Sequence, residues 1–154
     1  YATLLEKLEE ADAGKELMRH AQRMIDAVNL STALKVRGRG TSAQEYFLPG
    51  GKEIDRSTFE AIAGDTSPAA LQAVANTSFS AVANTTTLSE ADQVIRENLD
   101  RSARRLAIRD PLGPGVVIDY LRRKENETAR LRLLARGKYY DVPREQLEKE
   151  LGRA

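Results

Sequence analysis

The stretch PGVVIDYLRRKENETARLRLLARG, residues 114–137, decides the fold class of this chain. Pro114 suits the first position of a helix, where its missing N–H leaves no hydrogen bond unmade. Pro111 and Pro114 also prevent a hydrogen-bonded helix from continuing into this stretch from upstream. We therefore predict a helix from Pro114 to Arg136 or Gly137, about 35 Å long at 1.5 Å per residue.

The sequence on both sides of this stretch predicts further helices. Leu4, Leu5 and Leu8 have the spacing of one helical face, and Leu147 and Leu151 lie one turn apart. The remaining helices are predicted from periodic apolar residues and start signals over residues 1–11, 12–38, 55–63, 67–75, 87–109 and from 143 onward. We therefore predict an all-α helical bundle of about six or seven helices.

Several ends and connections follow from local residue chemistry. Asp12, Asp55, Ser67 and either Thr87 or Ser89 are expected to cap helices with their side-chain oxygens. Arg37 is placed to interact with the negative end of the helix over 12–38. Pro49-Gly50 predicts a type II turn in Leu48-Pro49-Gly50-Gly51, and apolar residues on both sides make a short, marginal hairpin conceivable. Residues 76–87 are the least regular stretch, with Phe79, Val82 and Leu88 as its expected anchors.

Composition excludes several classes of function. The 154 residues are 41% hydrophobic and 31% charged, which suits one folded domain over residues 1–154. There is no Cys and a single His, so disulfide frameworks, cysteine-ligated zinc and sites that need two imidazoles are excluded. The longest strongly apolar run is Val116-Val117-Ile118, far below the ~20 residues of a membrane span. No signal peptide is expected, and the start at Tyr1 suggests a fragment of a longer protein.

The candidate chemical groups are better explained by structural roles. His20 lies within a predicted helix and is expected to be exposed or hydrogen-bonded, because one imidazole cannot build a metal site. The Gly-rich loops lack the sequence of a phosphate cradle. Glu127 lies within reach of Arg123 and Arg130, so helical ion pairing accounts for it. We expect no catalytic, cofactor-binding or metal-binding residues and no cofactor.

The basic residues of the last third carry the strongest functional signal. Residues 1–100 contain ten Lys or Arg against fifteen Asp or Glu, whereas residues 101–154 contain fourteen against eight. Such an asymmetry indicates a charged partner, although a solvated helix face also produces it. The interface candidates are the arginines of two successive predicted helices, Arg101, Arg104, Arg105, Arg122, Arg123 and Arg130.

A weak internal repeat relates residues 26–38 to residues 125–137. Asp26 aligns with Glu125, Leu34 aligns with Leu133, and both stretches end in Arg-Gly. Each is followed by a loop with aromatic residues and a short helix. The pattern suggests duplicated helical units.

The C-terminal half resembles the C subunit of the prokaryotic A/V-type ATPases, the counterpart of the d subunit of eukaryotic V-ATPases. The resemblance lies in motifs that occur in the same order here: Asp110-Pro111-Leu112-Gly113, residues 116–120, Lys124-Glu125-Asn126-Glu127, Arg130-Leu131-Arg132, Arg136-Gly137-Lys138 and Val142-Pro143-Arg144-Glu145-Gln146-Leu147. Upstream, residues 26–34 and the turn Phe47-Leu48-Pro49-Gly50-Gly51 are also similar. The family is about twice as long, so this chain resembles its C-terminal half.

The resemblance implies a non-enzymatic rotor coupling protein. Family members form a funnel of three similar helical units on the cytoplasmic face of the membrane, as peripheral proteins. They join the D and F subunits of the central stalk to the membrane proteolipid ring and transmit torque during proton or sodium transport. A partial funnel would leave a former interface exposed, so self-association of the chain is a further expectation.

Two other functions stay open. The same arginines would suit a helical module that binds nucleic acid or anionic lipid. The nearly neutral overall charge and the lack of a known motif count against nucleic acid. An enzyme centred on His20 and a carboxylate would require a pocket that joins the two groups.

Overall fold

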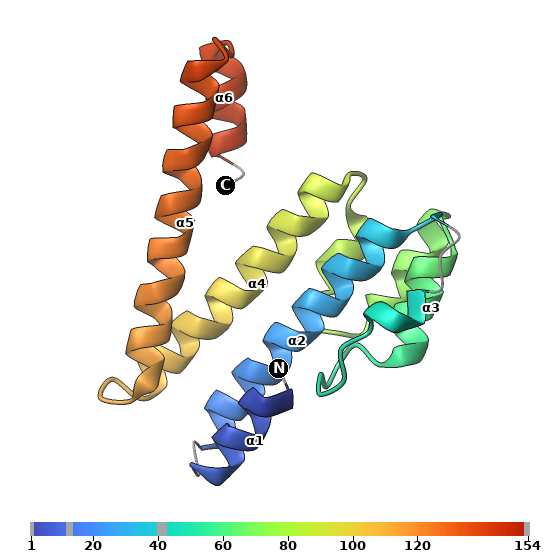
Figure 1. The fold of residues 1–154 in the computed structure, drawn as a ribbon, viewed down its shortest axis with the longest axis vertical. Coiled ribbons are helices and arrows are strands. Elements are labelled where there is room, and N and C mark those ends of the chain that lie inside the picture. Colours follow the sequence, from blue (N-terminus) through green and yellow to red (C-terminus); the bar gives the residue numbers. More distant parts are fainter. Residues whose placement is uncertain (1, 12–13, 40–42, 153–154) are drawn as a thin grey trace. The chain divides into compact units, whose positions relative to one another are not determined.

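The computed structural model describes residues 2–11, 14–39 and 43–152, and these residues form helices joined by short connections (Figure 1). The α-helices are α1 (Ala2–Glu10), α2 (Lys15–Val36), α3 (Arg56–Gly64), α4 (Leu88–Arg109), α5 (Pro114–Tyr139) and α6 (Arg144–Leu151). Three short 3₁₀ helices complete the set, η1 (Ala43–Tyr46), η2 (Pro68–Val74) and η3 (Ser80–Asn84). The all-α prediction is confirmed. The two long helices α4 and α5 lie within one or two residues of their predicted starts, and α5 extends past Gly137 to Tyr139.

The chain divides into two compact units, residues 1–102 and residues 103–154. The expectation of one domain over residues 1–154 stays a prediction. The internal repeat, which relates residues 26–38 to residues 125–137, also stays a prediction. Both stretches of the repeat are helical, but Asp26 is buried whereas Glu125 is exposed.

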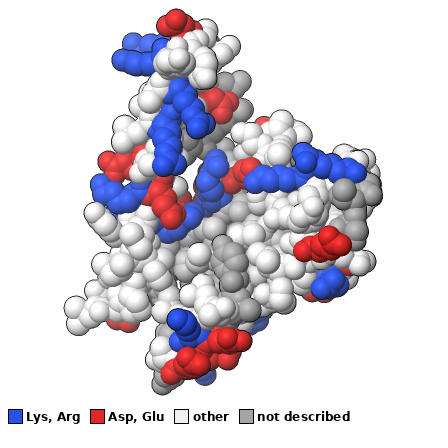
Figure 2. All heavy atoms as spheres, viewed as in Figure 1, with Lys and Arg blue, Asp and Glu red and all other residues white. Residues whose placement is uncertain are grey.

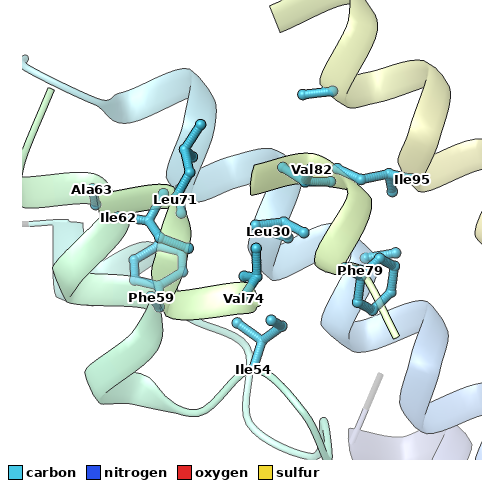
Figure 3. Packing of buried hydrophobic residues seen from close by; sticks show 13 residues of the cluster. Leu30, Ile54, Phe59, Ile62, Ala63, Leu71, Val74, Phe79, Val82 and Ile95 are labelled. Atoms are coloured by element: carbon cyan, nitrogen blue, oxygen red, sulfur yellow. The ribbon is translucent and has the colours of Figure 1, made fainter. Parts of the chain in front are cut away.

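The hydrophobic core lies in the first unit. Side chains from α2, α3, η2, η3 and α4 point toward one another in Figure 3. Leu30, Phe59, Val74, Phe79 and Val82 are each fully buried, with no solvent exposure. Large apolar side chains that are buried this completely provide the main stabilisation of a small domain.

The 3₁₀ helices η2 and η3 contribute to this core with apolar side chains that are spaced three residues apart. Leu71 and Val74 of η2 lie three residues apart, as do Phe79, directly before η3, and Val82 within it, and all four are buried. A 3₁₀ helix has three residues per turn, so such pairs point to one side. Phe79 and Val82 are confirmed as anchors, whereas Leu88 is 45% exposed and the prediction for it is wrong. Leu88 is the first residue of α4, and its side chain lies outside the core.

The connection over residues 48–54 is attached to α2 by two polar side chains. Asn29 donates from Nδ2 to the Leu48 carbonyl at 2.8 Å and accepts from the Leu48 N–H at 2.9 Å. The Asp26 carboxylate accepts the backbone N–H groups of Lys52, Glu53 and Ile54 at 3.0–3.1 Å. The predicted turn is present, with φ of 106° at Gly50. The marginal hairpin is absent among the described residues, because α2 satisfies these backbone groups instead of a strand.

The helix starts bear out some predicted caps and correct others. The Asp55 carboxylate accepts the Thr58 N–H at 2.7 Å, as predicted. Thr87, rather than Ser89, caps α4, since Thr87 Oγ1 accepts the Glu90 N–H at 3.2 Å. The Ser67 side chain makes no capping bond, because its hydroxyl donates to the Asp65 carboxylate. The expected cap Asp12 lies outside the described residues, and α2 begins after Gly14.

Arg37, at the end of α2, makes two hydrogen bonds to a distant part of the chain. Its Nε donates to the Asp65 carbonyl at 2.8 Å, and its Nη2 donates to the Ser67 carbonyl at 2.6 Å. The guanidinium therefore connects the end of α2 to the link between α3 and η2, and its predicted interaction with the end of its own helix stays a prediction. Its fork of donors suits two neighbouring carbonyls.

The second unit is built on two close helix contacts. A Cβ at Gly115 would lie 2.8 Å from the backbone carbonyl carbon of Leu106, so glycine lets α5 approach α4. A Cβ at Gly137 would lie 2.1 Å from Leu147 Cδ2, so α6 packs directly on α5. The helix α5 ends with Asp141 in the left-handed region, and the Val142 N–H donates back to the Gly137 carbonyl at 2.9 Å.

Candidate functional site

The predicted arginines of α4 lie together on one exposed side of that helix. Arg101, Arg104 and Arg105 are all exposed. Arg101 donates from Nε to the Glu97 carbonyl at 3.3 Å. Among the described residues, neither Arg104 nor Arg105 has an ion pair or a hydrogen bond to its side chain. These two guanidinium groups therefore retain all their donors for a partner.

The predicted arginines of α5 are divided between two sides of the helix. Arg123 and Arg130 are exposed and lie seven residues apart, which places them on the same side. Arg123 pairs with Asp119. Arg122 lies on another side, where its side chain is 20% exposed and pairs with Glu125 at 3.2 Å. In Figure 2, Lys and Arg side chains are interspersed with Asp and Glu side chains over the upper part of the region where α5 lies.

An exposed apolar surface accompanies these arginines and was not predicted. Among the described residues, ten of the thirteen exposed large hydrophobic side chains belong to residues 103–154. Four of them form what we call the α5 stripe, namely Val116, Tyr120, Leu131 and Leu134, which are 43%, 57%, 60% and 37% exposed. Contiguous exposed apolar surface is uncommon on monomeric proteins, so the stripe is a candidate interaction site.

The spacing of the stripe was present in the sequence. Val116 and Leu134 are eighteen residues apart, which equals five turns of an α-helix, and Tyr120 and Leu131 lie close to the same line. Charged residues fill the turns between them, so the pattern is typical of a solvated helix. Only burial distinguishes an apolar face that packs inside the chain from one that remains exposed.

Two grooves border the contact between α5 and α6. The larger, of about 700 Å³, has Leu134, Val142 and Leu151 in its lining. The smaller, of about 480 Å³, has Leu133 and Tyr140 in its lining. Gly137 and Leu147 line both grooves. Their charged lining residues are balanced in sign, so neither groove selects a charged small molecule.

Two buried titratable side chains, His20 and Asp26, are held by hydrogen bonds within the fold. His20 is buried, with Nδ1 at 2.9 Å from Ser102 Oγ, as expected for a hydrogen-bonded helix histidine. Burial raises the pKa of Asp26, while its hydrogen bonds from Ile54, Lys52 and Glu53 lower it. The carboxylate accepts hydrogen bonds from these three backbone amides, so its role is to anchor the connection over residues 48–54 to α2. Within the described ranges, no three His, Asp or Glu residues are grouped to hold a metal ion.

The helices also lack the character of membrane spans. In the part of the chain that the structure describes, every helix is too short or too polar to cross a bilayer.

Comparison with known proteins identifies the family. A family model described as ATP synthase (C/AC39) subunit matches residues 1–150. The C subunit of the V-type ATP synthase of Deinococcus radiodurans is 38% identical over 136 residues, which cover 88% of this chain and 36% of the relative. The corresponding V-type C subunit of Thermus thermophilus is 38% identical over 128 residues, covering 82% of this chain and 39% of that protein.

A more distant relative is the C subunit of the A-type ATP synthase of Methanothermobacter thermautotrophicus. It is 30% identical over 129 residues, which cover 75% of this chain and 33% of the relative. The chain therefore spans between 33% and 39% of the length of these three relatives. The match of the family model over nearly the whole chain agrees with the all-α fold and with the ordered motifs of the sequence. This chain belongs to the ATP synthase (C/AC39) subunit family.

Proposed function

We propose that this chain is a non-catalytic coupling part of a V/A-type ATP synthase. In this proposal it joins the D and F subunits of the central stalk to the membrane proteolipid ring and transmits torque during proton or sodium transport. It works at the cytoplasmic face of the membrane as a peripheral protein, within the funnel of the longer family protein. Family membership over residues 1–150 is the observation that carries the proposal.

The surface of residues 103–154 supports a role in assembly. This unit contains thirteen Lys or Arg against eight Asp or Glu, and it holds most of the exposed large hydrophobic side chains. Basic and apolar groups together suit a protein partner, because arginine binds carboxylates through two hydrogen bonds at once. Torque transmission needs such fixed contacts, whereas it needs no cofactor.

Charge reversal at three exposed arginines tests the proposal. We expect the triple variant Arg101→Glu, Arg105→Glu and Arg123→Glu to bind the purified D–F stalk pair or the proteolipid ring at least tenfold more weakly. Its melting temperature should stay within a few degrees of the unmodified chain, because the three side chains lie outside the core. Binding is measured at one ionic strength, with duplex DNA as a parallel ligand.

A matched control separates a local contact from net charge. Lys7→Glu, Lys15→Glu and Lys52→Glu change the charge by the same amount at exposed positions of the first unit. This variant should retain stalk or ring binding. Equal loss in both variants, or no loss in the arginine variant, would contradict the assigned surface. Binding to duplex DNA in place of stalk and ring would favour the nucleic-acid alternative.

A further inference from the structure

The α5 stripe runs along one helix as two apolar patches, Val116 with Tyr120 and Leu131 with Leu134. Val116 and Leu134, at its two ends, are separated by about 27 Å along the helix axis. Tyr120 and Leu131 lie between them and are each more than half exposed. A line of apolar side chains at helical spacing is the pattern by which one helix packs on another. The length of the line matches a partner helix of about five turns.

The contacts of α5 within its own unit use a different side of the helix. Gly115 faces Leu106 of α4, and Gly137 faces Leu147 of α6. These glycines are the buried residues of α5. They are offset from the stripe by about a quarter of a turn around the helix. The stripe therefore stays exposed while both contacts are made, and its end at Leu134 also lines the larger groove beside α6.

Beside the stripe, basic side chains outnumber acidic ones. Arg123 and Arg130 lie along one edge, where Arg123 pairs with Asp119, and Lys124 lies in the middle, where its Nζ pairs with Glu127 at 2.6 Å. Lys138 continues this side toward the end of the helix. A complementary partner carries carboxylates beside its own apolar residues, since opposite charges across an interface favour association and exclude other partners.

We propose that the α5 stripe docks an amphipathic helix of a protein partner, with acidic residues flanking the apolar face of that helix. The inference rests on the proposed function, because it specifies the chemistry of the partner that the coupling surface receives. Val116 and Tyr120 contact one end of the partner helix, and Leu131 and Leu134 contact the other. Lys124 and Arg130 face its acidic positions.

Two other occupants fit the charges less well. A second copy packed stripe on stripe would bring its Arg123 and Arg130 toward those of the first copy, and like charges oppose that contact. A lipid surface would accept basic residues, but the Lys124–Glu127 ion pair divides the stripe into two short apolar patches. An interfacial helix needs a continuous apolar face.

The first test removes apolar surface without adding charge. The double variant Tyr120→Ser and Leu131→Ser is tested against the D–F stalk pair and the proteolipid ring. It should bind whichever of the two binds the unmodified chain at least tenfold more weakly. Its matched control is Ile108→Ser and Leu112→Ser, which removes two large apolar side chains that are 69% and 100% exposed in the same unit but outside α5. The control should bind within about twofold of the unmodified chain. Equal binding by the stripe variant would overturn the inference.

The second test identifies the occupant. A photoreactive phenylalanine analogue at position 120 replaces an exposed aromatic residue, so folding should be unaffected. Irradiation of the assembled complex should crosslink the analogue to a helix of a partner protein that carries Asp or Glu beside its apolar face. Mass spectrometry identifies the crosslinked peptide. A crosslink to a second copy, to lipid from anionic vesicles, or to a basic segment would overturn the inference.

The two proposals can fail separately. Loss of binding in the arginine variant with full binding by the stripe variant would overturn this inference and leave the proposed function in place. Failure of the unmodified full chain to bind stalk or ring would overturn both.

Discussion

Asp26 and Gly51 lie so close that a Cβ at Gly51 would be 2.1 Å from Asp26 Oδ1. The buried carboxylate of Asp26 meets the loop at this glycine and accepts the next three backbone N–H groups. The absence of a side chain at position 51 is therefore what allows the loop to wrap around the carboxylate. Polar groups buried in this way need their partners, because an unpaired donor or acceptor is costly.

The contact predicts that Gly51→Ala destabilises the chain. The new methyl group would displace the carboxylate, at a cost of about 1–3 kcal/mol in the free energy of unfolding. Gly64→Ala is the matched control, because a Cβ there meets nothing within 4 Å. At this helical position alanine should leave stability unchanged or raise it by up to about 1 kcal/mol. Urea unfolding followed by circular dichroism measures both, and equal stability of the two variants would contradict the prediction.

The capping of α4 gives a second prediction. Thr87 Oγ1 accepts the Glu90 N–H, and Glu90 Oε2 accepts the backbone N–H groups of Thr86 and Thr87. This reciprocal arrangement is a capping box. Thr87→Ala should lower the free energy of unfolding by about 1 kcal/mol. Ser89→Ala, at an exposed position two residues later, should change it by less than about 0.5 kcal/mol. A larger loss at position 89 would show that the cap was assigned to the wrong residue.

A third prediction concerns the end of α5. Asp141 has φ of 51°, and it allows the Val142 N–H to reach the Gly137 carbonyl. Asp141→Val should destabilise the α5–α6 connection by about 1–2 kcal/mol, since a β-branched residue resists the left-handed conformation. Asp141→Gly should be more stable than the Val variant by at least that amount, because glycine adopts this conformation without strain. Amide hydrogen exchange over residues 144–151 reports the difference, and equal protection in the two variants would contradict the strain argument.

A fourth prediction follows from the raised pKa of Asp26. Burial raises this pKa above its ordinary value of 3.8, its three amide donors oppose the shift, and the charge of Glu53 adds to it. When the pKa of a carboxyl group is higher in the folded chain than in the unfolded chain, its contribution to stability is largest at a pH where the group is protonated in both. That contribution is therefore lost as pH rises above about 4. The stability advantage of the unmodified chain over Asp26→Asn should decrease between about pH 4 and pH 7.

Asp55 provides the contrast in sign. The Thr58 N–H holds the pKa of Asp55 below its ordinary value, so its contribution is present above about pH 4 and is lost as pH falls. The advantage of the unmodified chain over Asp55→Asn should therefore increase with pH. Urea unfolding at several pH values tests both variants, and the same direction of change in both would contradict the opposite shifts.

Local signals in the sequence were sufficient for the helices and several of their ends. The Asp55 cap, the start of α5 at Pro114 and the turn at Pro49-Gly50 depend on residues within a few positions of one another. Such interactions are determined by neighbouring residues alone, so they can be recognised without the fold. The prediction for Leu88 failed because a side chain near a helix start can point to either core or solvent.

The burial of α2 shows where local pattern was insufficient. Among the apolar residues of α2, Ile25 and Leu30 are fully buried and Leu17, Met24 and Val28 are half-buried. The polar Asp26 and Asn29 are fully enclosed as well. Nothing within α2 indicates that residues 48–54 would supply hydrogen-bond partners for these two side chains. Their partners lie about twenty to thirty residues away, and only the folded chain brings them within reach.

By itself, the sequence determined the helical class, the family and the basic character of residues 101–136, because composition, periodicity and ordered motifs do not depend on packing. Only the tertiary structure decided which faces of those helices are covered. It placed Arg122 in an ion pair on a half-buried side, left Arg104 and Arg105 exposed, and revealed the α5 stripe. The physical reason is that an apolar helix face has the same spacing whether it packs inside its own chain or awaits a partner, and only the position of neighbouring elements distinguishes the two.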